Sequence, residues 1–206
     1  MRLVTLFLLC TFATVTHAQV GRNQGLLDAN LAGREQLLAL PHMSGPLVDA
    51  LMAARPITSA GQLDAALAAT LDDARRAEVY ESVFRQIDLN SASEAEIMLI
   101  PGMSKRMAHE FEEYRPYQSL EQFRREIGKY VDEDEVARLE QYIFIPLGLN
   151  SATKADLMTI PGMDERMAHE FEEYRPYTSL EQFRREIGKY VDDDEVARLE
   201  SYVTLD

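Results

Sequence analysis

The sequence predicts an all-α protein made of three tandem units of about 60 residues, each a compact, pseudo-symmetric bundle of four to five short helices. Repetition defines the units, because residues 106–117 are identical to 166–177, and 119–132 to 179–192. A diverged copy precedes them at the same spacing, with matching residues at Asn30, Pro41, Met43, Arg55, Ser59 and Gln62. We therefore predict a first unit over 26–85, a middle unit over 86–145 and a third unit over 146–206.

Capping signals and apolar spacing place the helices of the middle unit. Ser93 with Glu96 forms a capping box that opens a first helix, and Pro101 ends it. A second helix has apolar residues at helical spacing and stops before Pro116, because proline disfavours helix at the residue preceding it. The apolar stripe of that helix consists of Met107, Ala108, Phe111 and Tyr114.

The second half of the unit repeats this arrangement. Ser119 with Gln122 caps a third helix that runs to Gly128, and Asp132 with Glu135 opens a fourth. The apolar faces of these two helices consist of Leu120, Phe123, Ile127, Val136, Leu139, Tyr142 and Ile143. Helices this short are marginal alone, so each unit must bury these faces in a shared core. We expect the three units to dock partially, since the connection over 144–148 is short and apolar.

A tight bend joins the first two helices of each repeated unit. It reads Ile100-Pro101-Gly102-Met103 in the middle unit and Ile160-Pro161-Gly162-Met163 in the third. Pro-Gly between two apolar residues, followed by a capping residue, stops one helix and starts the next. A helix N-terminus has unpaired N–H groups and a positive dipole end, which together attract phosphate.

This bend, and the longer run from Asp88-Leu89-Asn90-Ser91-Ala92 to Tyr142-Ile143, resemble the helix-hairpin-helix domain of ComEA-like competence DNA receptors. The resemblance implies two helix-hairpin-helix motifs per unit, and duplex DNA held without sequence preference through hairpin backbone amides. The implied phosphate site consists of Pro101, Gly102, Met103, Ser104, Lys105 and Arg106. A weaker equivalent consists of Pro161, Gly162, Met163, Asp164 and Arg166, and Arg124, Arg125 and Lys129 are supporting basic residues.

Several positions depart from the family pattern. The second glycine of the hairpin is replaced by Ser104 or Asp164, and the first unit has His42 and Ser44 instead. We interpret the Ser and Asp residues as N-caps. The Asp164 carboxylate repels a phosphate about 4 Å away by about 1 kcal/mol in water and by about 4 kcal/mol at an intermediate dielectric. The helix dipole attracts the same phosphate by only about 0.3–1 kcal/mol. We therefore expect the middle hairpin to bind best.

Charge weakens the DNA interpretation without excluding it. The chain has a formal charge of −14, and acidic runs occupy the second bend of each repeated unit over 132–135 and 192–195. Screening over about 8 Å at physiological salt still lets a local basic patch act. Two alternatives stay open: a weak, sequence-independent DNA-binding protein, or an acidic scaffold that has lost DNA binding and faces a basic protein partner.

Residues 1–18 read as a signal peptide, with Arg2 before a short apolar run and small residues before cleavage near Ala18. The sequence thus predicts an exported protein, periplasmic or extracellular, with no membrane span. Cys10 is the only cysteine, so the mature chain has no disulfide.

No catalytic or cofactor chemistry is evident in the sequence. It contains no nucleophile–base constellation and no phosphate loop, and His109 with Glu112 or Glu113 lacks the second histidine of a common zinc motif. The acidic runs lack the mid-loop glycine of a calcium loop. We therefore expect no enzyme activity, no cofactor, no metal and no small-molecule substrate.

Overall fold

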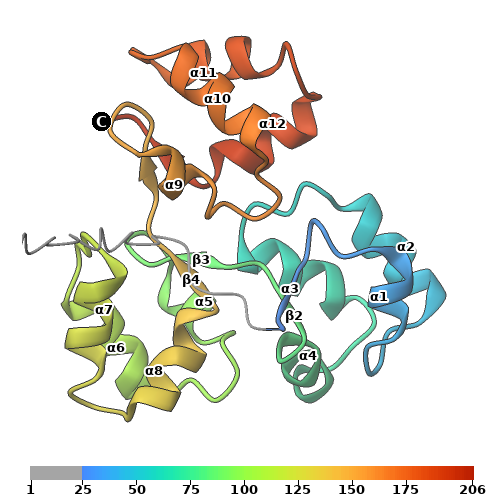
Figure 1. Ribbon diagram of the computed structural model, residues 1–206. Helices are drawn as coiled ribbons and strands as arrows, with labels where there is room; N and C mark the ends of the chain where they lie inside the picture. Colours follow the sequence, from blue (N-terminus) through green and yellow to red (C-terminus); the bar gives the residue numbers. More distant parts are fainter. Residues whose placement is uncertain (1–24) are drawn as a thin grey trace, which may run out of the picture.

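The computed structural model describes residues 25–206, and the predicted signal peptide over 1–18 lies outside these residues. The described part of the chain is mostly helical, with 12 helices and six strands of two residues each (Figure 1). Over residues 26–85, the first of the three units that the sequence predicts, the helices are α1 (Arg34–Leu38), α2 (Gly45–Ala53), α3 (Ala60–Ala68) and α4 (Asp73–Tyr80). Those of the middle unit are α5 (Glu94–Ile97), α6 (Lys105–Glu113), α7 (Leu120–Ile127) and α8 (Glu133–Glu140). Those of the third unit are α9 (Lys154–Leu157), α10 (Glu165–Glu173), α11 (Leu180–Ile187) and α12 (Asp193–Glu200).

The strands were absent from the all-α prediction. They are β1 (Leu27–Asp28), β2 (Val83–Phe84), β3 (Ile87–Asp88), β4 (Ile143–Phe144), β5 (Leu147–Gly148) and β6 (Val203–Thr204). They form three parallel pairs, with Leu27 opposite Val83, Ile87 opposite Ile143 and Leu147 opposite Val203. Each pair joins the residues before a set of four helices to those after it, so both ends of each set are held together.

The helices begin at the caps that the sequence predicts. In the middle unit the side chain of each N-cap residue accepts a hydrogen bond from the amide three residues later. The N-caps are Ser93, Ser104, Ser119 and Asp132, and the donor amides are those of Glu96, Met107, Gln122 and Glu135. The capping box predicted at Ser93 is confirmed, and the structure has an equivalent one at Thr153. In the first unit Ser44 is also an N-cap residue, but its side chain makes no capping hydrogen bond.

Buried apolar residues form two clusters. One runs from Leu26 to Ile145 and so spans the first and middle units, and the other runs from Phe144 to Val203. In Figure 1, α10, α11 and α12 group apart from the helices of the other units. Within residues 25–206 no helix has the length and apolar character needed to cross a bilayer.

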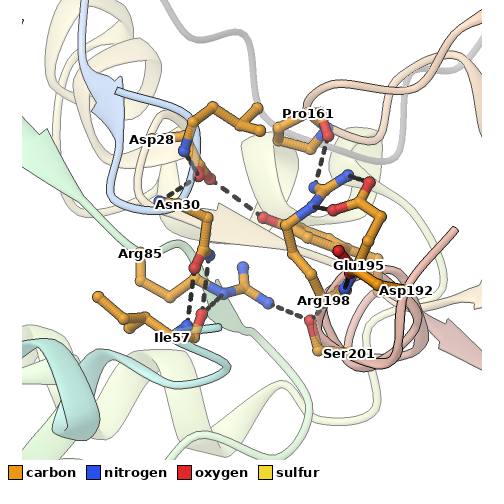
Figure 2. A network of polar contacts seen from close by, with 11 residues as sticks. Asp28, Asn30, Ile57, Arg85, Pro161, Asp192, Glu195, Arg198 and Ser201 are labelled. Atoms are coloured by element: carbon orange, nitrogen blue, oxygen red, sulfur yellow. Dashed lines mark hydrogen bonds and ion pairs between the residues drawn. The ribbon is translucent and has the colours of Figure 1, made fainter. Parts of the chain in front are cut away.

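The third unit is tied to the first by a buried polar junction (Figure 2). Arg85 is fully buried, with its guanidinium carbon 4.1 Å from the centre of the Tyr202 ring and its Nη2 donating to Ser201 Oγ at 2.7 Å. The Tyr202 hydroxyl donates to Asp28 Oδ2 at 3.3 Å. These contacts fix the position of α12 and β6 relative to the start of the described chain.

Candidate nucleic-acid interface

The bend between α5 and α6 is a four-residue turn. The amide of Met103 donates to the carbonyl of Ile100 at 3.0 Å, with Pro101 at the second position and Gly102 at the third. Gly102 has φ +75°, which a type II turn requires and which glycine adopts without strain. The third unit has the same turn, with Gly162 at φ +77°, whereas the first unit places His42 there at φ +63°.

Beyond this turn, α6 begins with free amides. Ser104 Oγ accepts from the Met107 amide at 3.2 Å, so the cap engages one of the unpaired N–H groups at this helix end. No acceptor within residues 25–206 bonds to the amides of Gly102, Ser104, Lys105 or Arg106. Gly102, Ser104, Lys105 and Arg106 are also exposed. The middle bend therefore presents several N–H groups to solvent, and the cap removes only one.

Two cations beside this bend have no internal partner. Within residues 25–206, Lys105 and Arg106 are the only Lys or Arg side chains that make no ion pair, hydrogen bond or ring contact. Both lie in the first turn of α6, next to the free amides. An unpaired cation keeps its full charge available for an external anion, and no carboxylate of the described chain neutralises these two residues.

The predicted supporting residues are placed differently. Arg124 makes a two-pronged ion pair with Glu140, Nε to Oε2 and Nη2 to Oε1, each at 2.6 Å. Arg125 pairs with Glu126 at 2.7 Å, and Lys129 also bonds to Glu126, which raises the pKa of Lys129. Their charges are thus largely neutralised inside the middle unit, and the structure does not bring them to the bend as free cations.

The side chain of Arg138, in α8, lies beside the middle bend, and the sequence analysis did not identify it. A Cβ built on Gly102 would lie 3.5 Å from Arg138 Nη2. Arg138 and Gly102 line an open groove of about 570 Å³ together with Glu81 and Glu135. Arg138 pairs with Glu135 at 2.7 Å, a hydrogen bond that raises the pKa of the guanidinium. The groove therefore has one guanidinium and two carboxylates. Its net charge is negative, so this side of the bend repels phosphate.

The second bend of the middle unit ends in acidic residues, as the sequence predicts. Asp132 caps α8 by accepting from the Glu135 amide at 2.9 Å, and Glu133 and Asp134 are exposed beside it. Acidic side chains in the first turn stabilise the helix through its dipole. They also repel phosphate, so this bend is not a suitable anion site.

The bend of the third unit is more obstructed than its sequence indicates. Asp164 caps α10 by accepting from the Met167 amide at 2.7 Å, and Arg198 Nη1 donates to the carbonyl of Pro161 at 2.6 Å. Arg166 lies over the Tyr190 ring, with its guanidinium carbon 5.9 Å from the ring centre. Leu31 of the first unit also lies against Gly162.

His109, which the sequence analysis weighed as a metal ligand, and two tyrosines of the middle unit contact neighbouring side chains. His109 faces Glu113 at 3.8 Å on the exposed side of α6, and the Tyr114 and Tyr130 hydroxyls are 2.8 Å apart. Over residues 25–206 no group of three or more His, Cys, Asp or Glu side chains is placed to hold a metal ion.

Comparison with known proteins assigns a motif to this region. No curated protein and no solved structure gives a significant match to the chain. The family model described as "Helix-hairpin-helix motif" matches residues 82–140, which include α5, α6, α7 and α8 and the bend at Gly102. This motif is generally one that binds nucleic acids. Residues 82–140 therefore carry a helix-hairpin-helix motif, with Lys105 and Arg106 at its first bend.

Proposed function

We propose that the protein is an exported, non-enzymatic chain of three tandem helix-hairpin-helix units that binds duplex DNA weakly and without sequence preference, as in ComEA-like proteins. In this proposal the backbone amides of the middle bend hold a phosphate, while Lys105 and Arg106 attract the backbone. The observation that carries the proposal is the coincidence of free amides, an exposed Gly102 and two unpaired cations at one helix end.

The expected affinity is low. Two cations neutralise about two phosphates, so log K should fall against log salt with a slope of about −1.8, or roughly 12-fold between 50 and 200 mM salt. The acidic second bend and the overall charge of −14 further reduce the attraction. Contacts to the phosphate backbone carry no direct sequence information, so binding through them should ignore sequence.

The test is a salt series of duplex binding by fluorescence anisotropy on the wild type and on Lys105→Glu with Arg106→Glu. We expect the double variant to lose binding and salt dependence. A charge-matched control, Arg75→Glu with Lys154→Glu, makes the same change in net charge at two exposed sites that do not line the groove at Gly102, and it should keep most of the binding. Equal losses in the two double variants would show that net charge, and not the bend, controls affinity.

A second candidate is an acidic scaffold for a basic protein partner. It is favoured by the internal pairing of Arg124, Arg125 and Lys129, which leaves the exposed acids of the second bend dominant. No duplex binding by the wild type, even at low salt, would remove the DNA proposal and leave this one.

A further inference from the structure

One position of the last helix reaches the first bend in all three units. In the first unit Glu78 of α4 meets His42 at the bend, with Oε2 and Nε2 2.7 Å apart. In the middle unit Arg138 Nη2 lies 3.5 Å from a Cβ built on the bend glycine. In the third unit Arg198 Nη1 donates to the carbonyl of Pro161 at 2.6 Å (Figure 2). These equivalent positions of the repeat therefore meet their own bends by the same fold.

The residue at this position gives each bend a different charge. Glu78 brings a carboxylate to the first bend, whereas Arg138 and Arg198 bring guanidinium groups. The Arg198 side chain is only 3% exposed and is bonded to a carboxylate and to the Pro161 carbonyl, so its charge is used inside the third unit. The Arg138 side chain is 33% exposed, and within residues 25–206 it makes no bond to the Pro101 carbonyl. Arg138 is therefore the guanidinium that can turn toward solvent at its bend.

A single carboxylate holds Arg138 in its present position. Arg138 Nε and Nη2 both donate to Glu135, each at 2.7 Å, and such a two-pronged pair fixes the plane of the guanidinium. The Glu135 side chain is 35% exposed, and an ion pair that water reaches adds little to stability. Both partners line the groove at Gly102. The pair can thus be separated at small cost to the fold.

We propose that Arg138 is a third phosphate-binding cation of the middle bend and that Glu135 restrains it, so that this pair limits the affinity for DNA. The inference rests on the proposed function and names the residues that regulate its site. With Glu135 uncharged, the groove would have one guanidinium and one carboxylate, that of Glu81, and would no longer be negative. A guanidinium released in this way can bind a phosphate through two hydrogen bonds.

The pair can be broken without changing the size of either side chain by much. Glu135→Gln removes the charge that holds Arg138. Glu135→Gln with Arg138→Gln then removes the released cation as well. Glu195→Gln is the matched control, because it makes the same change in net charge beside Arg198, which stays bonded to the Pro161 carbonyl. The comparison uses the wild type and these three variants.

In duplex binding by fluorescence anisotropy we expect a salt slope of about −1.8 for the wild type and for Glu195→Gln, as two cations give. Glu135→Gln should steepen the slope to about −2.7, or roughly 40-fold between 50 and 200 mM salt, because a third cation then reaches phosphate. The double variant should return to about −1.8. An unchanged slope in Glu135→Gln, or an equal steepening in Glu195→Gln, would overturn the role of Arg138.

The side-chain signal of Arg138 separates this inference from the proposed function. In ¹⁵N-labelled protein the Arg138 Nε signal should shift with duplex in Glu135→Gln and stay unmoved in the wild type, while the Gly102 amide signal shifts in both. A Gly102 shift in both forms with an unmoved Arg138 signal would overturn the role of Arg138 and leave the proposed function standing. A Gly102 signal that moves in neither form would overturn the proposed function and this inference with it.

Discussion

Gly102 and Gly162 share a backbone conformation but not an environment. Their φ angles of +75° and +77° are in the left-handed region, where a residue with a side chain is strained. At Gly102 an added methyl group meets Arg138 at an ordinary contact distance of 3.5 Å. At Gly162 it meets Leu31 at 3.1 Å, closer than two carbons pack without a shift.

We predict unequal costs for the same substitution at these two positions. Gly102→Ala should lower the free energy of unfolding by about 1 kcal/mol, from backbone strain alone. Gly162→Ala should lower it by about 2 kcal/mol, because overpacking against Leu31 adds at least about 1 kcal/mol. In a Leu31→Ser background the two costs should become equal. Urea unfolding measures both, and equal costs in the wild-type background would contradict the Leu31 contact.

At the scale of elements, α7 and α8 are joined by the Arg124–Glu140 ion pair. The Glu140 side chain is only 7% exposed, so removing Arg124 leaves a carboxylate in a poorly hydrated place. We predict that Arg124→Ala lowers the free energy of unfolding by about 2 kcal/mol. Lys105→Ala, at an exposed and unpaired position, should change it by less than about 0.5 kcal/mol. Similar losses of unfolding free energy in the two variants would contradict the view that Arg124 stabilises the fold through Glu140.

Carboxyl groups at the ends of α7 and α11 should also make the stability of the fold fall at acid pH. Lys129 and Arg125 lower the pKa of Glu126, and Lys189 and Arg185 lower that of Glu186, mainly through hydrogen bonds to the carboxylates. A carboxyl whose pKa is lower in the folded state stabilises the fold above its unfolded pKa of about 4.3, and this stabilisation is lost as pH falls through the folded pKa.

We therefore expect the urea midpoint to decline below about pH 4.3. The decline should be shallower in a variant with Glu126→Gln and Glu186→Gln, because neither side chain then takes up a proton in this range. Urea unfolding at several pH values between about 3 and 6 tests this. An identical decline in wild type and variant would assign the acid sensitivity to other carboxyls.

Local signals were sufficient to predict most elements. Ser93, Ser104, Ser119 and Asp132 cap helices where the sequence places them, because a cap is determined within four residues. The strands were missed because two residues are too few for an alternating pattern, and each pairs with a partner 56 residues away. Likewise, pairing of Arg124 with Glu140 depends on how α7 meets α8, which local spacing does not determine.

At the scale of the whole molecule, contacts between units were the least predictable feature. Leu31 and Gly162 are 131 positions apart, and Arg85 and Ser201 are 116 apart. Neither pair is suggested by caps, periodicity or repetition, because the first unit differs from the others at both Leu31 and Arg85. A repeat implies equivalent sites, but docking gives those sites different surroundings.

The Arg85 junction should couple the units in unfolding. Its guanidinium is fully buried and donates to Ile57, Gln86 and Ser201 while lying over Tyr202. We predict that Arg85→Ala lowers the free energy of unfolding by about 3 kcal/mol, because buried acceptors lose their donor. The radius of gyration from solution scattering should rise as the third unit separates. An unchanged midpoint and radius would show that docking does not depend on Arg85.

The central claim is that the amides of the middle bend, with Lys105 and Arg106, form the DNA contact. The most direct test is titration of ¹⁵N-labelled protein with a short duplex, followed through the amide signals of the whole chain. We predict shifts centred on residues 102–106, with residues 132–135 and 162–166 unchanged. Unmoved signals at 102–106, with shifts elsewhere or nowhere, would contradict the account.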